Sequence, residues 1–202
     1  MQAKGEKEEN RIGIYVCHCG LNIAGVVDCK GVAEYGKGLR DVVVSRHDTY
    51  LCSEPGQNLI KTDIREQGLN RIVVASCSPR LHEPTFRKCL HEAGLNPYLL
   101  EMANLREQCS WVHSHDPQGA TQKSKDLVRS AVARARWLSV REEIEVPIEP
   151  ATLVLGGGVA GIQAALDLAD SGYRVILVEK GPSIGGVMAW LDKTYPTMDC
   201  SI

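Results

Sequence analysis

The stretch Thr152–Gly181, TLVLGGGVAGIQAALDLADSGYRVILVEKG, decides the fold of the second part of this 202-residue chain. Gly156, Gly158 and Gly161 form a G-x-G-x-x-G pattern that follows an apolar run and opens an amphipathic helix. The first glycine permits a tight turn, the second lets the backbone approach a pyrophosphate, and the third allows close helix–strand packing. We therefore predict the first βαβ unit of a Rossmann-like, dinucleotide-binding domain. Its expected elements are strand Ala151–Leu155, helix Val159–Asp170 and strand Tyr173–Glu179.

The residues around this turn indicate the kind of dinucleotide. Free N–H groups at the start of the helix suit phosphates, and Glu179, at the end of the second strand, suits the ribose hydroxyls of an adenosine. Glu179-Lys180 is followed after a short spacer by Gly185-Gly186, an order that resembles FAD-binding flavoproteins of the disulfide-reductase type and favours FAD over NAD. The other interpretation of the second glycine pair is a surface turn. The residues expected at the cofactor are Gly156, Gly157, Gly158, Val159, Ala160, Gly161, Glu179, Lys180, Gly185 and Gly186.

The first part of the chain, residues 11–140, alternates apolar runs with amphipathic stretches. Such alternation favours a parallel sheet covered by helices, so we predict a small α/β domain. The expected strands are Ile12–Val16, Val42–Val44, Ile72–Ala75 and, as a fourth candidate, Pro97–Leu100; the expected helices are Pro55–Gly68, Pro84–Gly94 and Gln122–Val140. A phosphate-loop-like pattern at Gly31–Lys37 lacks the Ser or Thr that should follow the lysine and falls in a helix-like stretch, so we reject it.

Composition limits the class of protein. The chain has 23 basic and 25 acidic residues, a net charge of −2, which excludes nucleic-acid binding driven by bulk charge. No apolar run reaches the roughly 18–20 residues of a membrane span, and the N-terminus lacks an export signal, so we expect a cytoplasmic protein. Residues 1–10 are expected to form a disordered tail, 141–150 a linker containing Pro147 and Pro150, and 151–202 the truncated start of the nucleotide-binding domain.

Eight cysteines, without an export signal, indicate metal, redox chemistry or buried thiols rather than disulfides. Cys17, Cys19 and Cys77 follow predicted parallel strands, so their thiols should meet at the carboxyl edge of the sheet, where Cys52 can join them from a neighbouring loop. Four thiolates hold either a zinc ion or an iron–sulfur cluster. An adjacent flavin domain favours the cluster, because zinc transfers no electrons. Cys109 is a fifth candidate that could equally pack in the core.

The remaining cysteines have simpler interpretations. Cys29 and Cys89 fall on apolar helical faces and are expected to be small buried hydrophobes. Cys200 could belong to a motif whose other members lie beyond residue 202. Which four of the five candidate cysteines would bind a cluster stays open at this stage.

Several segments together resemble the A subunit of heterodisulfide reductase. They include VCHCG at 16–20, CSPRLHEPTFR at 77–87, LGGGVAGIQAALDLA at 155–169 and TYPTMDCSI at 194–202. The resemblance runs from about Arg11 to Ile202 and implies an N-terminal iron–sulfur domain, with a [4Fe-4S] cluster, followed by an FAD-binding, thioredoxin-reductase-like domain. In that family the A subunit continues well past this point, so the chain is expected to be a fragment or a split subunit that does not perform the full reaction alone.

The resemblance also implies a function and partners. In the family the FAD carries out electron bifurcation: electrons enter from a hydrogenase or formate dehydrogenase and leave to ferredoxin and, through the B and C subunits, to a heterodisulfide. The assembly is expected to be a homodimer, and this chain is expected to hold no catalytic acid, base or nucleophile. The alternative hypothesis is a subunit-docking module in which four cysteines hold a structural zinc ion.

Overall fold

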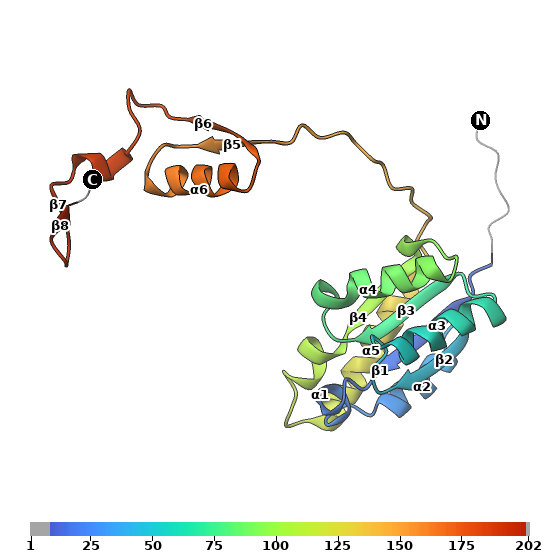
Figure 1. Cartoon of the computed structure of the whole chain (residues 1–202). Coiled ribbons are helices and arrows are strands. Elements are labelled where there is room, and N and C mark those ends of the chain that lie inside the picture. Colours follow the sequence, from blue (N-terminus) through green and yellow to red (C-terminus); the bar gives the residue numbers. More distant parts are fainter. Residues whose placement is uncertain (1–8, 201–202) are drawn as a thin grey trace. The chain divides into compact units, whose positions relative to one another are not determined.

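The structure is a computed structural model that describes residues 9–200. It divides the chain into two compact units, the first ending at Glu142 and the second beginning at Glu143 (Figure 1). The division falls at the start of the segment expected as a linker, and residues 138–150 contain no helix or strand. Most of the expected disordered tail, residues 1–8, lies outside the described residues.

The first unit is built on a four-stranded parallel sheet with the strand order β2-β1-β3-β4. The central strand β1 is buried along its whole length, as its apolar sequence IGIYVC requires, and Tyr15 lies between Arg46 of β2 and Val74 of β3. The strands are β1 (Ile12–Cys17), β2 (Val42–Asp48), β3 (Arg71–Ser76) and β4 (Leu100–Asn104). The parallel α/β fold predicted for this part of the chain is confirmed.

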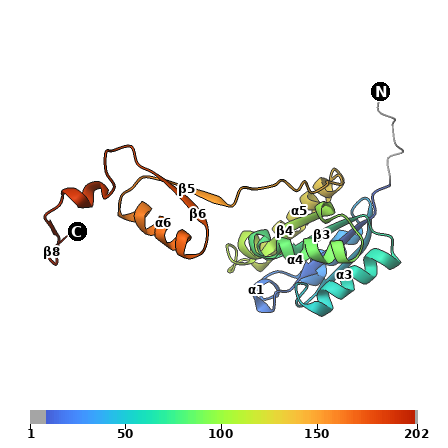
Figure 2. The ribbon, with the colours of Figure 1, turned by 45° about the horizontal axis from the view of Figure 1, so that its top comes forward.

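Helices cover both faces of the sheet (Figure 2). One face packs against α2 and α5, and the other against α3 and α4, so the first unit has two apolar core clusters, one on each side. The elements are α1 (Leu21–Ala24), α2 (Cys29–Lys37), α3 (Glu54–Glu66), α4 (Pro79–Glu92), the 3₁₀ turn η1 (Pro97–Leu99), the π-helical turn η2 (Arg106–Ser110) and α5 (Pro117–Ala135). Because α2 contains the stretch Gly31–Lys37, rejecting a phosphate loop there is confirmed.

Two predicted ends are wrong, because β2 runs on to Asp48 instead of ending at Val44 and α5 ends at Ala135 instead of Val140. Three predicted starts are also wrong, each for a local reason. Residues Pro97–Leu99 form a 3₁₀ turn that the Asn96 side chain caps, so the fourth strand begins only at Leu100. Helix α4 begins at Pro79, where Ser78 caps it, and Pro84 lies inside the helix rather than at its start. Helix α5 begins earlier than expected, at Pro117, because the Asp116 side chain accepts a hydrogen bond from the N–H of Gly119. A side-chain cap and a proline in the first turn favour a helix start at each of these positions.

The second unit contains the predicted βαβ unit. Strands β5 (Ala151–Leu155) and β6 (Arg174–Val178) pair in parallel, and α6 (Val159–Asp170) connects them. The 3₁₀ turn η3 (Gly186–Trp190) and the short antiparallel strands β7 (Lys193–Thr194) and β8 (Asp199–Cys200) follow. These elements agree with the first βαβ unit of a Rossmann-like domain.

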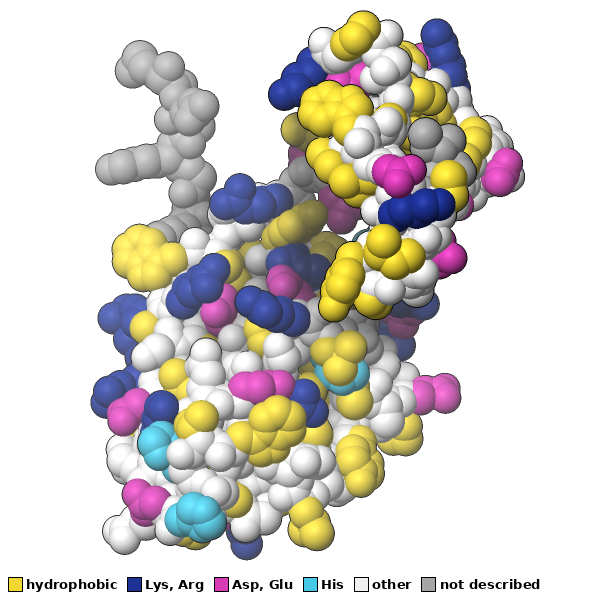
Figure 3. Space-filling model, turned by 90° about the vertical axis from the view of Figure 1, so that its left-hand side faces the viewer, with side chains coloured by type: hydrophobic (Ala, Val, Ile, Leu, Met, Phe, Trp, Pro, Cys, Tyr) yellow, Lys and Arg dark blue, Asp and Glu magenta, His cyan; other side chains and the backbone are white. Residues whose placement is uncertain are grey.

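Much of the apolar surface of the second unit is uncovered. No residue of α6 is buried, and Leu153 and Leu155 of β5 are 58% and 74% exposed. Figure 3 shows hydrophobic side chains spread over this unit, in the upper part of the view. A two-stranded sheet with one helix has too few layers to bury both of its faces. Among the described residues, no helix has the length and apolar character needed to cross a bilayer.

Candidate cofactor and thiol sites

The glycine-rich turn has the geometry that its sequence predicts. Gly156 adopts a positive φ of 106°, which favours glycine, and its N–H donates to the carbonyl of Val178 at 2.8 Å. At Gly161 an added Cβ would lie only 1.8 Å from the carbonyl oxygen of Gly156, so the helix approaches the turn as closely as a glycine allows. At Gly158 an added Cβ meets no atom within 4 Å. Gly161 therefore serves internal packing, whereas Gly158 leaves open space beside the turn.

Glu179 closes the turn from the end of β6. One carboxylate oxygen accepts from the N–H of Gly157 at 2.6 Å, and the other accepts from the N–H of Gly181 at 2.7 Å. These hydrogen bonds lower the pKa of Glu179, because they stabilise its charged form. Sequence reasoning placed this carboxylate at the ribose. In this structure its oxygens bind the backbone, and a ribose hydroxyl would have to share them.

The second pair of glycines lies against the first turn. Gly185 donates its N–H to the carbonyl of Gly157 at 2.6 Å, and a Cβ at Gly186 would lie 3.0 Å from the Cα of Gly158. Both glycines have positive φ, 111° and 56°. A hollow of about 320 Å³ beside these loops is lined by Val159, Ile162, Gln163, Ile184, Gly185, Met188 and Ala189. The two loops thus form one continuous surface, with Val159, Ala160 and Lys180 exposed on it.

Four of the five candidate cysteines come together at the carboxyl edge of the sheet in the first unit; we call Cys17, Cys19, Cys52 and Cys77 the four-thiol site. Cys17 ends β1 and its Sγ accepts from the N–H of Cys19 at 3.3 Å. Burial raises the pKa of Cys17, hydrogen bonds from the backbone oppose the shift, and the neighbouring thiols of Cys19 and Cys52 add to it. Burial raises the pKa of Cys77 to about 11; Arg106 opposes this shift, and the other three thiols add to it. The thiols are therefore within electrostatic reach of one another.

The structure does not bring Cys109 to this site. Cys109 is fully buried in the core cluster formed with α2 and α5, and its thiol hydrogen-bonds with Ser124. Cys17, in contrast, belongs to the cluster on the other face of the sheet, and Cys52 packs against that same cluster. Burial raises the pKa of Cys109, and no thiol of the four-thiol site contributes to the shift.

Sequence reasoning missed two neighbours of the four-thiol site. Cys29, expected only as a buried hydrophobe, is buried, and its thiol also lies 3.8 Å from the carbonyl oxygen of Cys17. Arg106 places Nη1 3.8 Å from the Sγ of Cys19. Its position in the sequence could have identified Arg106, because it begins the segment after β4 and therefore lies at the same edge of the sheet. Cys89 is buried near Gln57, and Cys200 is exposed in the second unit.

The spacing of the thiols bears on what they could hold. In the part of the chain that the structure describes, no three His, Cys, Asp or Glu side chains are placed to hold a single metal ion. A tetrahedral zinc ion with sulfur at about 2.3 Å requires thiolates only about 3.8 Å apart. The thiolates of a [4Fe-4S] cluster each bind a different iron and stand further apart.

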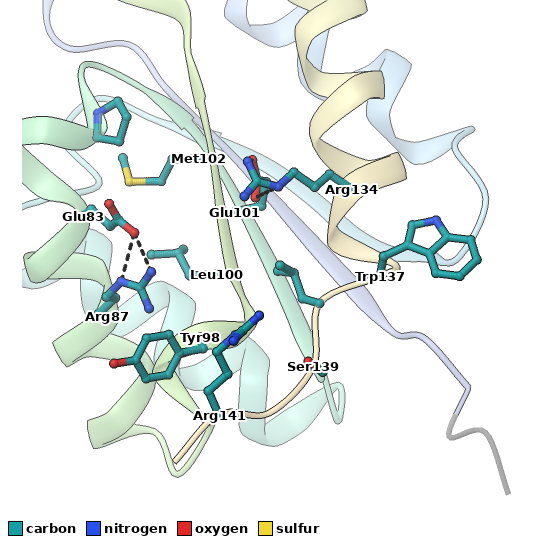
Figure 4. A pocket seen from close by; sticks show the side chains of 12 residues that line it. Glu83, Arg87, Tyr98, Leu100, Glu101, Met102, Arg134, Trp137, Ser139 and Arg141 are labelled. Atoms are coloured by element: carbon teal, nitrogen blue, oxygen red, sulfur yellow. Dashed lines mark hydrogen bonds and ion pairs between the residues drawn. The ribbon is translucent and has the colours of Figure 1, made fainter. Parts of the chain in front are cut away.

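The groove along β4 is a separate feature. It has a volume of about 370 Å³ and lies between α4 and α5, where Glu83 pairs with Arg87 and Glu101 with Arg134 (Figure 4). Its acidic groups are thus already neutralised by arginines. No residue expected at the cofactor or in the four-thiol site lines it.

Comparison with known proteins finds similar sequences for both units of the chain. Residues 152–191 match the model of the FAD dependent oxidoreductase family. The chain is 67% identical over 196 residues to the iron-sulfur A subunit, number 2, of the CoB–CoM heterodisulfide reductase of Methanopyrus kandleri, covering 97% of the chain and 30% of that protein. Over nearly its whole length the chain is therefore similar to the N-terminal portion of heterodisulfide reductase A subunits. It is also 63% identical, over 96% of its length and 30% of the relative's, to the A subunit of the H₂:CoB-CoM heterodisulfide,ferredoxin reductase of Methanothermobacter thermautotrophicus.

A third relative is named for a different electron source. The A subunit of the ferredoxin/F420H₂-dependent CoB-CoM heterodisulfide reductase of Methanosarcina acetivorans is 55% identical over 95% of the chain and 24% of its own length. The chain therefore spans less than a third of the relatives it matches, and corresponds to the N-terminal portion of these proteins. These relatives are oxidoreductase subunits, so the resemblance seen in the sequence is confirmed.

Proposed function

We propose that this chain is the electron-transfer portion of a heterodisulfide reductase A subunit that binds FAD and one [4Fe-4S] cluster. The observation that carries the proposal is the convergence of Cys17, Cys19, Cys52 and Cys77 at one edge of the sheet. Their number and residue type match the ligands of a [4Fe-4S] cluster. The adjacent FAD-binding unit favours the cluster over zinc, because zinc transfers no electrons. When bound, the cluster would carry one electron at a time and would take part in no acid–base step.

The nucleotide-binding residues would hold FAD at the two glycine loops. The N-terminus of α6 presents free N–H groups and the positive end of the helix dipole, which suit a pyrophosphate. The open space at Gly158 admits the pyrophosphate. The Glu179 carboxylate ties the first turn to Gly181, and the N–H of Gly185 donates to the carbonyl of Gly157, which joins the two loops. The uncovered apolar side chains of β5 and α6 support the proposal that further segments of the longer protein complete this domain.

The relatives' names support a place in a larger complex. We propose that the complete subunit bifurcates electrons at its FAD, taking them from a hydrogenase or formate dehydrogenase and passing them to ferredoxin and to the B and C subunits, in a cytoplasmic assembly that is a homodimer. Two relatives are named for ferredoxin, one as reductase and one as ferredoxin-dependent. This chain contributes cofactor binding and electron transfer to that reaction, and no catalytic acid, base or nucleophile.

Metal and flavin analysis of the anaerobically purified chain tests the proposal. About four irons with sulfide per chain, together with FAD, is the expected result. Serine substitutions of Cys17, Cys19, Cys52 and Cys77 should each lower the iron content, whereas the matched Cys109→Ser variant should keep it. Zinc without iron would support the docking module with a structural zinc site instead. Iron retained in two or more of the four variants would contradict the four-thiol assignment.

A further inference from the structure

Arg106 places a cation beside the four-thiol site. It begins η2, directly after β4, and its Nη1 lies 3.8 Å from the Sγ of Cys19. The guanidinium therefore places a positive charge directly beside one thiol of that site. Only 18% of its side chain is exposed, which limits screening of that charge by water.

The guanidinium is held in place by several contacts. Its Nη2 donates to Glu107 Oε1 at 2.8 Å, and its Cζ lies 4.8 Å from the centre of the Trp111 ring. The hydroxyl of Ser110 donates to the carbonyl of Asn22, which ties η2 to α1, the short helix that follows Cys19. This support fixes the distance between the cation and the thiol, as an electrostatic role requires.

Glu107 reduces the effect of that cation. Its carboxylate pairs with Arg106, while its second oxygen is buried without a hydrogen-bond partner among the described residues. The net electrostatic field at the four-thiol site is therefore the field of the nearby Arg106 cation, reduced by the opposing field of the Glu107 carboxylate. Two charges that oppose each other at one site allow that field to be changed in either direction by a single substitution.

We propose that Arg106 tunes the four-thiol site, raising the reduction potential of the iron–sulfur cluster bound there by stabilising its reduced state. The inference rests on the proposed function. Reduction by one electron makes the cluster and its four thiolates more negative by one charge and breaks no bond. A fixed cation near Cys19 stabilises that more negative state more than the oxidised one. Arg106 thus acts on the cluster through its positive charge, and it does not ligate the metal.

An EPR-monitored redox titration of the full chain, with dithionite as reductant, tests the inference. In Arg106→Gln the equilibrium constant for one-electron reduction should fall about tenfold, which corresponds to a midpoint potential about 59 mV lower. Arg106→Lys keeps the charge and should restore most of the potential. Glu107→Gln removes the opposing anion and should raise the potential above that of the unsubstituted chain. Iron content is measured in every sample.

The outcomes separate this inference from the proposed function. Unchanged potentials in Arg106→Gln and Glu107→Gln, with full iron content, would overturn the tuning role and leave the cluster assignment intact. Loss of iron from both Arg106→Gln and Arg106→Lys would instead assign Arg106 a structural role and also overturn the inference. An unsubstituted chain that binds no iron would overturn the proposed function itself, and metal analysis alone reveals that result.

Discussion

Substituting Gly161 by alanine should disrupt the nucleotide-binding turn from within. The added Cβ would lie 1.8 Å from the carbonyl oxygen of Gly156, whereas real Cβ atoms are essentially never found within 3.0 Å of such an atom. Helix α6 must therefore move away from the turn by more than about 1 Å, and overpacking of this kind costs about 1–3 kcal/mol. Local opening of α6 should become about 5- to 150-fold more frequent, since 1.36 kcal/mol is a factor of ten.

Gly158→Ala is the matched control. The new Cβ would meet no atom within 4 Å, and Gly158 has φ −77° and ψ −178°, which alanine adopts without strain. This variant should keep α6 as well protected as in the unsubstituted chain. Because Gly158 lies where the backbone would approach the pyrophosphate, its affinity for FAD should still fall.

Hydrogen exchange of the α6 amides, followed by mass spectrometry without flavin, measures the first effect, and fluorescence titration with FAD measures the second. Gly161→Ala should show both faster exchange of the α6 amides and weaker FAD binding. Gly158→Ala should show only the weaker FAD binding. Equal protection of α6 in Gly161→Ala and the unsubstituted chain would refute the packing argument. Faster exchange in Gly158→Ala than in Gly161→Ala would refute the division of roles between the two glycines.

Three further predictions follow from other contacts. Asp63→Ala should destabilise the first unit by about 1–3 kcal/mol in urea melts, because the buried Tyr15 hydroxyl loses its acceptor, whereas the half-exposed Arg46 stays solvated. A loss below about 0.5 kcal/mol would contradict this. Without bound metal, iodoacetamide at pH 8 should label the exposed Cys200 well before Cys29, whose pKa is raised to about 12 chiefly by burial, as peptide mass mapping can check. The pKa of Glu179 is lowered from 4.5 by backbone hydrogen bonds, so their contribution to stability should be present above about pH 4.5 and be lost as the pH falls through the lowered pKa. A titration midpoint of the Glu179 carboxylate above pH 4.5, measured by NMR, would contradict this prediction.

Local sequence determined the elements whose signals lie within one turn or one strand. The glycine spacing at Gly156, Gly158 and Gly161 marks a strand, a tight turn and a helix because each glycine meets a steric need only a few residues away. The run IGIYVC of β1 is apolar throughout, so it marks a strand covered on both faces. Errors occurred where a side-chain cap moved a boundary, as at Asp116 and Asn96.

Tertiary structure alone decided which thiols meet. Cys77 and Cys109 each follow a strand of the same parallel sheet, so sequence position places both near its carboxyl edge. The π-helical turn η2 directs Cys109 into the core beside α5, while Cys77 stays near Cys17 and Cys19. Arg106, at the start of the same turn, instead reaches the thiol of Cys19. The face on which a side chain is buried depends on the packing of distant helices, and periodicity within one segment contains no information about that packing.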